Sequence, residues 1–400
     1  MTVADRIDTP TQLLGGGRVL TPDGVRSGAW VHVSAGRIVA IASARPDVDA
    51  PLIDLQGAWL LPGYIDLHMH GGGGHNVSDS LQAMEQAVGF HRNHGTTGTL
   101  VSLVTAPEEA LCAQLGWVAE LVRRGPSRRG HVLGSHLEGP FLSPLRCGAQ
   151  NEAHMTTPDM ALLERLWAAA GETLKMVTIA PELPGALPLI EALSGAGVIA
   201  ALGHSNATYE QALAGIRAGA NHATHLFNAM PPLHHRRPGL IAAAFEAGIT
   251  CELINDGTHL HPAIVRLVFE LVQSPALVTD AIDATGVGDG RFELGGQEVL
   301  VHDGEARLVA TGSLAGSTLT MDKALRNAVR SCGLSIERAS AAASLMPARA
   351  LGLEQEVGSI APGMRADLVV LDDDLELTSV MAGGLWCEPA PSPHDRLTNT

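Results

Sequence analysis

Six residues that can bind a metal ion stand at the downstream ends of segments that read as β-strands. Imidazole nitrogens and carboxylate oxygens are the usual protein ligands of zinc and of related divalent metals. In a parallel α/β barrel all strands end on one face, so residues far apart in the sequence would meet there. The pattern predicts a metal-dependent hydrolase with these candidate ligands: His68, His70, Glu138, His204, His225 and Asp280.

The first three ligands end two separate strand-like segments. His68 and His70 close GYIDLHMH as a His-x-His pair, and alternate residues of a strand share a face, so both imidazoles should enter the barrel mouth. Such a pair alone is weak evidence, because it is often incidental. Glu138 closes HVLGSHLEG, where a buried carboxylate needs a cation, although a surface loop is the alternative. We expect His136 to support the site or to pack, since the ligand set is complete without it.

The remaining ligands follow the same rule. His204 in ALGHSNA and His225 in ATHLFNAMPP form with Glu138 a set of two imidazoles and one carboxylate. Asp280 closes ALVTDAI. An aspartate beside a metal-bound water can bind the metal, accept the proton of the attacking water and pass it to the leaving group. Taken singly, Asp280 could instead cap the segment that follows.

The other histidines are expected outside the ligand set. His222 should face away from His225, and His91 should lie on the surface or in a loop. One group forms a positive patch in an otherwise acidic chain, which suits an anionic substrate group, while a solvated loop explains it equally well. This patch consists of His234, His235, Arg236 and Arg237.

Composition limits the partners and the compartment. The formal net charge of −16 argues against nucleic acid and anionic membranes, because an acidic surface repels phosphate groups. The 5 cysteines are scattered and lack CxxC spacing, so neither a disulfide framework nor a thiolate zinc site is indicated. No apolar run approaches the ~20 residues that span a bilayer, and none resembles a signal peptide. We expect a soluble cytoplasmic protein.

Strand-like and helix-like segments alternate eight times along the middle of the chain. The helix-like segments have apolar residues at helical spacing, and several open with Ser, Asp or Pro as caps would. The fold class is therefore predicted to be α/β, with a (β/α)₈ barrel of the TIM type over residues 63–350. A doubly wound open sheet competes, but it gives no reason for ligands to recur at strand ends. The predicted strands are GYIDLHMH, TGTLVSLVTA, HVLGSHLEG, LKMVTIAPE, VIAALGHSN, NHATHLFNA, TCELINDGT and ALVTDAI.

Both flanks of the barrel carry short β-like segments separated by Gly and Asp turns. Residues 1–62 and 351–400 are expected to pair into one discontinuous small β-sandwich domain. The barrel would thus lie between the two halves of a domain built from both chain ends.

Longer motifs carry a resemblance to a known family. They include PGYIDLHMHGG, HLEGPFLSP, GAQNEAH, GHSNAT, ATHLFNAMPPLHHRRPG, NDGTHLHP, VTDAIDATG and LAGSTLTMDKALRN. With them, nearly the whole chain resembles the N-acetylglucosamine-6-phosphate deacetylase family of the amidohydrolase superfamily. The resemblance implies hydrolysis of the acetamide of N-acetyl-D-glucosamine 6-phosphate to D-glucosamine 6-phosphate and acetate, by a metal-bound hydroxide with an Asp acid/base. It places the reaction in amino-sugar catabolism and cell-wall recycling, in a cytoplasmic homodimer.

The resemblance also assigns roles to single residues. Glu138, His204 and His225 match the principal metal ligands of the family, and Asp280 matches its catalytic acid/base. Some relatives carry a histidine that polarises the amide carbonyl where this chain has Gln150, so Gln150 or the second metal would have to replace it. The implied substrate-binding residues are Ala149, Gln150, Asn228, Ala229, Arg236, His259, Leu314, Ala315 and Gly316.

This sequence has both histidines of the His-x-His pair. Some family members lack them and bind one metal ion, so the pair indicates a second ion here. We expect two divalent ions per chain, with Glu138 bridging, His68, His70 and Asp280 on one ion, and His204 and His225 on the other. Zinc is the expected metal, with iron, cobalt or manganese as alternatives.

Two other functions remain open on the sequence alone. Another amidohydrolase chemistry, such as opening a cyclic amide or deaminating a base, would use the same metals; the basic HHRRPG segment favours a phosphorylated substrate instead. A non-catalytic scaffold on the same barrel is the second alternative. Retention of every ligand speaks against it.

Overall fold

The computed structural model describes residues 9–126 and 130–387. At its centre is an eight-stranded sheet whose pairings are all parallel. Its spatial order equals the order along the chain, so each strand lies beside its predecessor. The strands are β6 (Tyr64–Asp66), β9 (Thr96–Val104), β10 (Val132–Glu138), β11 (Leu174–Ile179), β12 (Ile199–Leu202), β13 (His222–Ala223), β14 (Thr250–Ile254) and β15 (Pro275–Val278).

The sheet closes into a barrel through the chain just beyond its first and last strands. The backbone N–H of His70 donates to Ala281 O and that of Asp280 donates to His68 O, each at 2.8 Å. Met69 and Ala281 form a parallel bridge between them. The predicted (β/α)₈ barrel is confirmed, and the open sheet is wrong. These closing bonds also bring the His-x-His pair beside Asp280.

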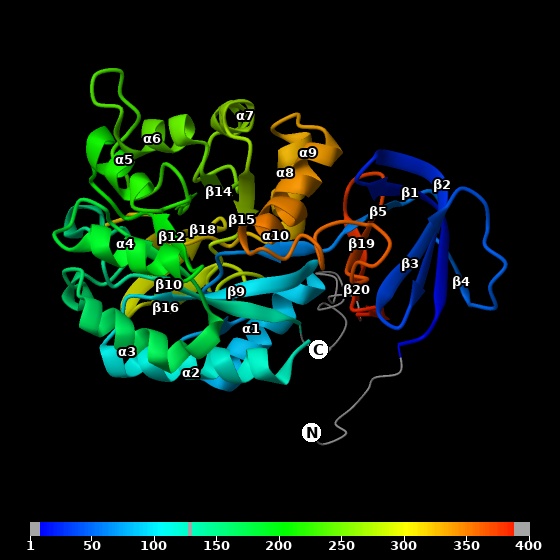
Figure 1. Ribbon diagram of the computed structural model, residues 1–400, viewed down its shortest axis with the longest axis horizontal. Coiled ribbons are helices and arrows are strands. Elements are labelled where there is room, and N and C mark those ends of the chain that lie inside the picture. Colours follow the sequence, from blue (N-terminus) through cyan, green and yellow to red (C-terminus); the bar gives the residue numbers. More distant parts are fainter. Residues whose placement is uncertain (1–8, 127–129, 388–400) are drawn as a thin grey trace.

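Helices follow the barrel strands and cover the outside of the barrel (Figure 1). They are α1 (Leu81–Asn93), α2 (Glu108–Arg124), α3 (Met160–Ala170), α4 (Ala186–Gly195), α5 (Tyr209–Arg217), α6 (Gly239–Ala247), α7 (Pro262–Leu271), α8 (Met321–Arg330), α9 (Ile336–Ser340) and α10 (Met346–Ala350). Thr208 and Gln211 form a capping box at the start of α5. Helix α2 carries acidic residues in its first turn and basic residues in its last, which complements the helix dipole. Among the described residues, no helix combines the length and the apolar character needed to cross a membrane.

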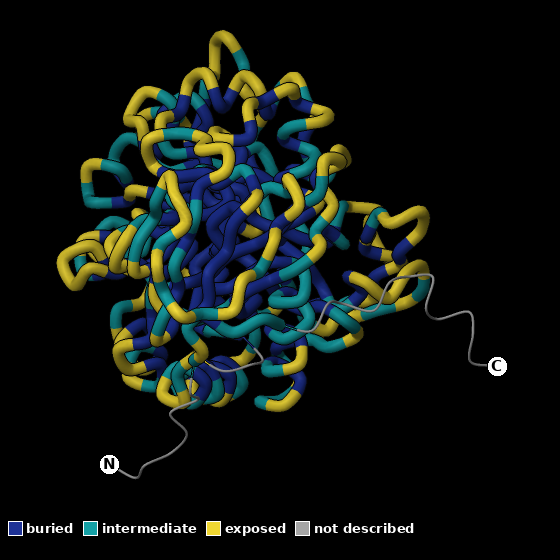
Figure 2. Tube along the Cα trace, turned by 90° about the vertical axis from the view of Figure 1, so that its right-hand side faces the viewer, coloured by how far each residue is buried: buried dark blue, intermediate teal, exposed yellow. Residues whose placement is uncertain are grey.

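The barrel core is built from strands buried on both faces. Every residue of β9 is buried, as expected for a parallel strand between the barrel interior and the outer helices. Leu100, Met176, Leu253 and Leu277 are fully buried, and such side chains contribute about 1.5–3 kcal/mol each. Figure 2 shows the buried segments gathered in the middle of the molecule and the exposed ones around them. This core fixes the strand ends on which the candidate ligands stand.

A second sheet joins the two ends of the described chain and lies to the right of the barrel in Figure 1. Its strand order is β21-β20-β19-β5-β1-β2-β3, and β4 pairs with β1. The antiparallel pairing of β19 with β5 links both halves, so the predicted small β domain from both termini is confirmed. The division at residues 62 and 351 stays a prediction, and residues 1–8 and 388–400 lie outside the described part. The strands are β1 (Gln12–Thr21), β2 (Gly24–Ser34), β3 (Arg37–Ala42), β4 (Leu52–Asp54), β5 (Trp59–Pro62), β19 (Leu368–Leu371), β20 (Leu377–Ala382) and β21 (Leu385–Trp386).

A three-stranded antiparallel sheet that the sequence analysis did not predict is inserted after the last barrel strand. It consists of β16 (Gly290–Leu294), β17 (Gln297–His302) and β18 (Glu305–Leu308). Its apolar side packs with Ile282 and Ala315. The Gln297 amide donates to Ala149 O at 2.6 Å. The inserted sheet therefore lies beside the barrel mouth and contacts a loop that the sequence analysis assigned to substrate binding.

The expectation that His91 lies on the surface or in a loop is wrong. His91 is fully buried on the inner side of α1, and its Nε2 lies 2.8 Å from Gly71 O. The adjacent Gly72 leaves room for the ring, because a Cβ at that position would lie 2.6 Å from His91 Nε2. Burial lowers the pKa of His91 from 6.5 to about 4.

This depressed pKa predicts a specific acid sensitivity. In the unfolded chain His91 binds a proton near its ordinary pKa of 6.5, whereas the folded protein resists protonation until about 4. Neutral His91 therefore contributes to the free energy of unfolding above pH 6.5. This contribution, on the order of 3 kcal/mol, is lost as the pH falls towards 4. In chelator, the melting temperature of the unaltered protein should fall more steeply across this range than that of His91→Gln, which keeps an N–H for Gly71 O. Parallel pH profiles of the two proteins would contradict this account.

Candidate metal centre and substrate pocket

Two groups of three ligand-type side chains meet at the downstream ends of the barrel strands. His68, His70 and Glu138 form the His68 group, and Glu138, His204 and His225 form the His204 group. Within each group the ligand atoms lie within 4.8 Å of one another, and every member is buried. Glu138 belongs to both groups, so its carboxylate lies between two pairs of imidazoles.

The ligand nitrogens within each pair face one another at short distance. His68 Nε2 lies 3.0 Å from His70 Nε2, and His204 Nε2 lies 3.0 Å from His225 Nε2. Glu138 Oε1 lies 3.2 Å from His204 Nε2 and 3.0 Å from His225 Nε2, while Glu138 Oε2 lies 3.3 Å from His70 Nε2. Nitrogen lone pairs directed at one another and at a carboxylate need positive charge between them. This donor set fits divalent transition metals such as zinc.

In three of these imidazoles the other ring nitrogen, Nδ1, lies against an oxygen that accepts a hydrogen bond. The Nδ1 contacts are His68 with Glu252 Oε2 at 3.1 Å, His70 with Ser102 O at 3.0 Å and His204 with Arg146 O at 2.9 Å. Because Nδ1–H donates to an oxygen acceptor in each case, the proton stays on Nδ1 and each Nε2 keeps its lone pair for a metal. His225 Nδ1 differs, since it is buried without a hydrogen-bond partner among the described residues.

Asp280 adds a second carboxylate at the edge of the His68 group. Its Oδ1 lies 3.2 Å from His70 Nε2 and 3.6 Å from His68 Nε2, and its side chain is 11% exposed. Burial acts to raise the pKa of Asp280, but in the metal-free chain positive charge on His68 and His70 outweighs it and holds that pKa below its usual value, and a metal ion bound by these residues would supply the same positive charge. Asp280 is therefore an ionised carboxylate that can accept a proton from a molecule in the pocket.

Backbone strain is concentrated around the same point. His204, His225, Phe227, Ala229 and Asp280 have positive φ angles of 45°, 28°, 79°, 49° and 51°. Residues with a Cβ avoid this region, and each such residue costs of order 1–3 kcal/mol. The surrounding barrel holds these residues in place. His204, His225, Ala229 and Asp280 line the mouth, whereas the Phe227 ring packs beside Phe245. Nothing in the sequence pattern indicated this strain.

The two groups open into a hollow of about 420 Å³. Its lining includes His70, Glu138, His204, His225 and Asp280. The hollow also gathers most of the residues that the sequence analysis assigned to substrate binding, and these are Ala149, Gln150, Asn228, Ala229, His259, Leu314 and Gly316.

Three of the expected site residues do not line this hollow. His68 is fully buried beneath it. Ala315 is also fully buried and packs into the apolar side of the inserted sheet. Arg236 is exposed and lines a separate hollow together with Arg237. Arg146 lines both hollows, so the hollow of Arg236 adjoins that of the candidate metal ligands without Arg236 lining the latter.

Gln150 is held on both sides of its amide. Its Oε1 accepts from the backbone N–H of Thr105 at 2.7 Å, and its Nε2 donates to Glu138 Oε2 at 2.5 Å. Since the Thr105 N–H fixes which end of the amide is the oxygen, the NH₂ group must face Glu138. Gln150 thus positions the shared carboxylate.

His259 is oriented by an aspartate that the sequence analysis did not select. Asp256 Oδ2 lies 2.6 Å from His259 Nδ1, and Asp256 Oδ1 accepts from the backbone N–H of His259 at 2.8 Å. Burial acts to raise the pKa of Asp256, but the hydrogen bond from His259 outweighs it, and that pKa lies below its usual value. Asp256 does not contact His259 Nε2, and the His259 side chain lines the hollow.

Glu252 is the most important residue that the sequence analysis missed. It is fully buried, and its carboxylate contacts His68 Nδ1, His222 Nε2 and the backbone N–H of His225, each at 3.1 Å. Burial acts to raise the pKa of Glu252, but hydrogen bonds from His222 and His68 hold it well below its usual value. A signal was present, because a glutamate between Cys251 and Leu253 in a predicted barrel strand must have buried partners.

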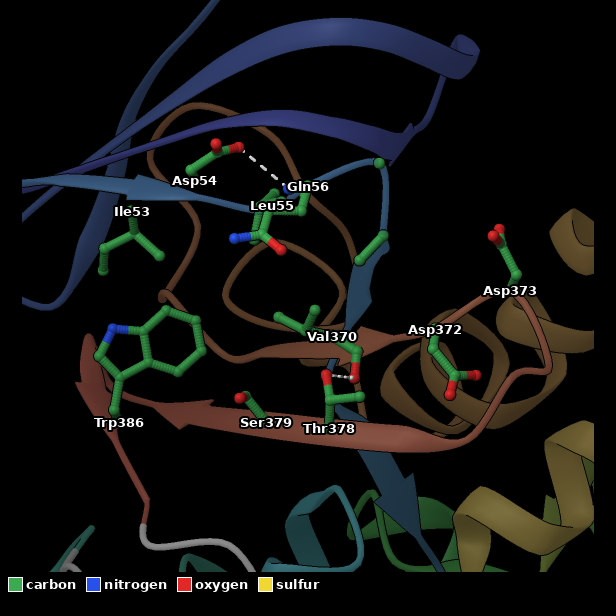
Figure 3. Close-up of a pocket in the computed structure, with 12 residues that line it drawn as sticks. Ile53, Asp54, Leu55, Gln56, Val370, Asp372, Asp373, Thr378, Ser379 and Trp386 are labelled. Carbon is green, nitrogen blue, oxygen red and sulfur yellow. Dashed lines mark hydrogen bonds between the residues drawn. The ribbon is translucent and has the colours of Figure 1, made fainter.

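A different hollow, of about 470 Å³, lies in the terminal sheet. Figure 3 shows Trp386 at one end of it and Asp372 and Asp373 at the other. Its carboxylates are engaged locally: Asp54 accepts from the backbone of Gln56 at 3.0 Å, and Asp373 pairs with Arg18 at 2.5 Å. Although this hollow is slightly larger, it gathers no catalytic constellation, so we assign the active site to the barrel mouth.

Comparison with known proteins agrees with this geometry. The chain matches the Amidohydrolase family over residues 59–387. It is 38% identical to an N-acetylgalactosamine-6-phosphate deacetylase of Escherichia coli O157:H7, over 94% of this chain and 98% of that protein. It is 37% identical to the N-acetylglucosamine-6-phosphate deacetylase of Homo sapiens, over 94% of both proteins.

Among solved structures, the fold is similar to that of a Mycobacterium smegmatis protein. That structure is a mutant N-acetyl-D-glucosamine-6-phosphate deacetylase in complex with N-acetyl-D-glucosamine-6-phosphate. The TM-score is 0.89 at 43% identity, and the match covers 94% of this chain and 99% of the other. The similarity therefore extends over the barrel and the terminal sheet together.

The glycine next to Asp280 in space gives a test of this site geometry. A Cβ on Gly316, which has a φ of 59°, would lie 2.8 Å from Asp280 O and 2.6 Å from Ile282 Cγ2. Gly312 in the same loop has a φ of 72°, but a Cβ there would meet no atom within 4 Å. Both alanine variants carry the backbone cost, whereas Gly316→Ala should lose about 1–3 kcal/mol more through overlap. Thermal melting measures the difference, and equal losses would contradict the packing of Gly316 against Asp280.

Proposed function

The chain belongs to the Amidohydrolase family, and from this premise we propose that it hydrolyses the acetamide of N-acetyl-D-glucosamine 6-phosphate to D-glucosamine 6-phosphate and acetate. The observation that carries the proposal is the pair of ligand groups sharing Glu138, with Asp280 beside them in the same hollow. The full-length likeness to deacetylases of phosphorylated amino sugars supports the substrate class.

The residues that would hold the metals follow from the two groups. We propose two divalent ions, with Glu138 between them, His68, His70 and Asp280 on one side and His204 and His225 on the other. Zinc suits these ligands best, with iron, cobalt or manganese as alternatives. A divalent ion at such a site supplies Lewis-acid chemistry, lowering the pKa of water from ~15.7 towards ~7 and polarising a carbonyl.

Asp280 would be the catalytic residue that moves the proton. As an ionised carboxylate on the wall of the hollow, it can take the proton from the attacking water. It would then deliver that proton to the nitrogen of the breaking amide. This delivery is needed because an unprotonated amine leaves an acyl carbon poorly.

The remaining polar groups of the hollow would orient the sugar. With Nδ1 held on Asp256, His259 presents Nε2 to the substrate. Asn228 and Gly316 line the same space. Gln150 directs one N–H of its NH₂ group at Glu138, and the second N–H remains available for the substrate carbonyl.

The direct test is acetate release from three sugars by the metal-loaded protein. We expect turnover of N-acetylglucosamine 6-phosphate and much weaker turnover of unphosphorylated N-acetylglucosamine. N-acetylgalactosamine 6-phosphate belongs in the same assay, because the relative from Escherichia coli O157:H7 bears the name of that activity. If the galactosamine epimer were hydrolysed faster, it would be the substrate. Absence of amide hydrolysis from all three sugars would refute the proposal.

We also propose a cytoplasmic homodimer. All 5 cysteines are free, as in a reducing compartment. Arg236 is exposed and does not line the hollow of the metal ligands, which is compatible with its contacting the sugar phosphate bound by a second copy. Light scattering of the purified protein tests the assembly, and a monomer would exclude this arrangement.

A metal-count prediction follows from the two ligand groups. The protein isolated without chelator should contain close to two divalent ions per chain, whereas replacing His68 by Gln and His70 by Asn should leave about one, because the His204 group is untouched. Elemental analysis of both proteins measures this. A single ion in the unaltered protein at saturating metal would rule out the two-metal assignment.

Replacement of Asp280 by Asn tests its role in proton transfer. The amide preserves the shape of the side chain but cannot accept the proton, so turnover should fall by at least ~10²-fold. The His204 group should keep its ion, which elemental analysis checks in the same sample. Near-normal turnover of Asp280→Asn would assign the proton to another group.

Arg236→Ala tests recognition of the phosphate. An arginine that grips a phosphate makes charge-assisted hydrogen bonds, so its loss should weaken binding of the phosphorylated sugar by about 1.5–3 kcal/mol, or roughly 10- to 150-fold. Steady-state kinetics on the unphosphorylated sugar should hardly change. Arg237→Ala is the matched control, since it removes the same charge from the same hollow. An equal loss on both sugars would indicate a structural role for Arg236.

A further inference from the structure

Glu252 is a buried carboxylate that contacts both ligand groups without being a candidate ligand itself. It comes from the middle of β14 and has no exposed surface. Its Oε2 lies 3.1 Å from His68 Nδ1 and accepts from the backbone N–H of His225 at 3.1 Å. Its Oε1 lies 3.1 Å from His222 Nε2. One carboxylate therefore receives three donors from two other parts of the barrel mouth.

The contact with His68 differs in kind from those of the other oriented ligands. The Nδ1 atoms of His70 and His204 lie against backbone carbonyls, of Ser102 and Arg146, which remain whatever the side chains are. His68 Nδ1 instead lies against a side chain. Among the described Nδ1 contacts of the ligand imidazoles, the Glu252 contact is the one that a single substitution can remove.

Removing this acceptor would change what His68 can do. With Glu252 present, the His68 proton stays on Nδ1 and the Nε2 lone pair faces His70 and Glu138. Without it, the proton can move to Nε2, which would put an N–H where a ligand lone pair is needed. Because His68 is fully buried, no water at the surface can take over the role of the acceptor.

Charge acts in the same direction. Two divalent ions would bring four positive charges into a buried site, and Glu138 and Asp280 supply two negative charges. Glu252 supplies a third negative charge next to His68, at a depth where charge is poorly screened. Loss of this charge would disfavour an ion at the His68 group in particular, because Glu252 contacts the side chain of His68 directly.

We propose that Glu252 is a positioning residue that makes His68 a metal ligand and thereby allows the His68 group to take a second divalent ion. The same carboxylate oxygen also holds the backbone of His225, so it ties the position of one ligand group to that of the other. The inference rests on the proposed metal centre, and it concerns the number of ions and not the identity of the sugar.

The test is zinc binding to the whole chain without any sugar. Chelator-stripped protein is dialysed against buffered zinc, and ions per chain are measured by elemental analysis. The unaltered protein should take up two ions in two steps. Glu252→Gln removes the charge and leaves one acceptor oxygen for three donors, with an NH₂ group facing the remaining donor. It should therefore weaken the second step by about 10- to 100-fold, the usual effect of losing such a supporting residue, and leave the first step nearly unchanged.

The matched control is Glu182→Gln. Glu182 accepts from Ser205 Oγ at 2.8 Å and from the backbone of Asn206 at 2.5 Å, and neither partner is a candidate ligand. This variant makes the same chemical change in the same protein and should bind two ions as the unaltered chain does. Equal weakening in both variants would overturn the specific role of Glu252.

A double variant separates positioning from a general structural effect. If Glu252 acts through His68, adding Glu252→Gln to His68→Gln should change zinc binding little, because the ligand is already gone. Additive losses would overturn the proposal. Should Glu252→Gln fail to fold by circular dichroism, Glu252→Asp retains the charge but is one methylene too short for the same contact. Its second zinc step should be weakened in the same way, and an unchanged second step would overturn the proposal.

These outcomes are independent of the deacetylase assay. An unaltered protein that binds one zinc ion, or a Glu252→Gln variant that titrates like the unaltered protein, would refute the role of Glu252 even if the sugar is hydrolysed. Two-step zinc binding that responds to Glu252→Gln in a protein that hydrolyses none of the three sugars would refute the proposed substrate alone.

Discussion

The closing hydrogen bonds between the first and last barrel strands are the interaction on which the site depends. The backbone groups of His68 and His70 pair with those of Asp280 and Ala281 at 2.8 Å. These bonds turn a row of parallel strands into a ring, so that ligands separated by two hundred residues surround one point. Without them His68 and Asp280 would stand at opposite edges of a sheet. The candidate metal centre is thus a consequence of barrel closure.

The closed barrel brings the ligand side chains near one another, but hydrogen bonds from neighbouring groups set the direction of each ligand atom. Backbone carbonyls hold His70 and His204, and Glu252 holds His68. The amide of Gln150 fixes the shared Glu138. Because a buried charge without partners is costly, each carboxylate here also depends on its donors, and the network is satisfied only as a whole. The strained backbone at His204, His225 and Asp280 is stable for the same reason.

The barrel is predictable from the sequence because its signals are local and repeated. Each strand is a short apolar run followed by a helix, and the His-x-His pair, Glu138 and Asp280 end their strands in the printed sequence. The alternation of side chains along a strand was enough to place His68 and His70 on one face. It was not enough for His91, which was expected near the surface and is buried, because the space for its ring is made by Gly72 on another segment. The inserted sheet from Gly290 to Leu308 was missed as well.

The sequence by itself determined the fold class, the family resemblance and the residues able to bind metal, since these depend on residue type and on spacing along the chain. Only the tertiary structure decided which groups stand behind the ligands and which expected residues share a hollow. The position of Glu252 inside a strand signalled buried partners, but the sequence could not say which ones, because they come from other strands. The role of Asp256 depends on a loop conformation. Arg236 was expected beside the ligands, yet it lies in a different hollow of the same chain. Contacts of this kind depend on distance in space, which spacing along the chain does not encode.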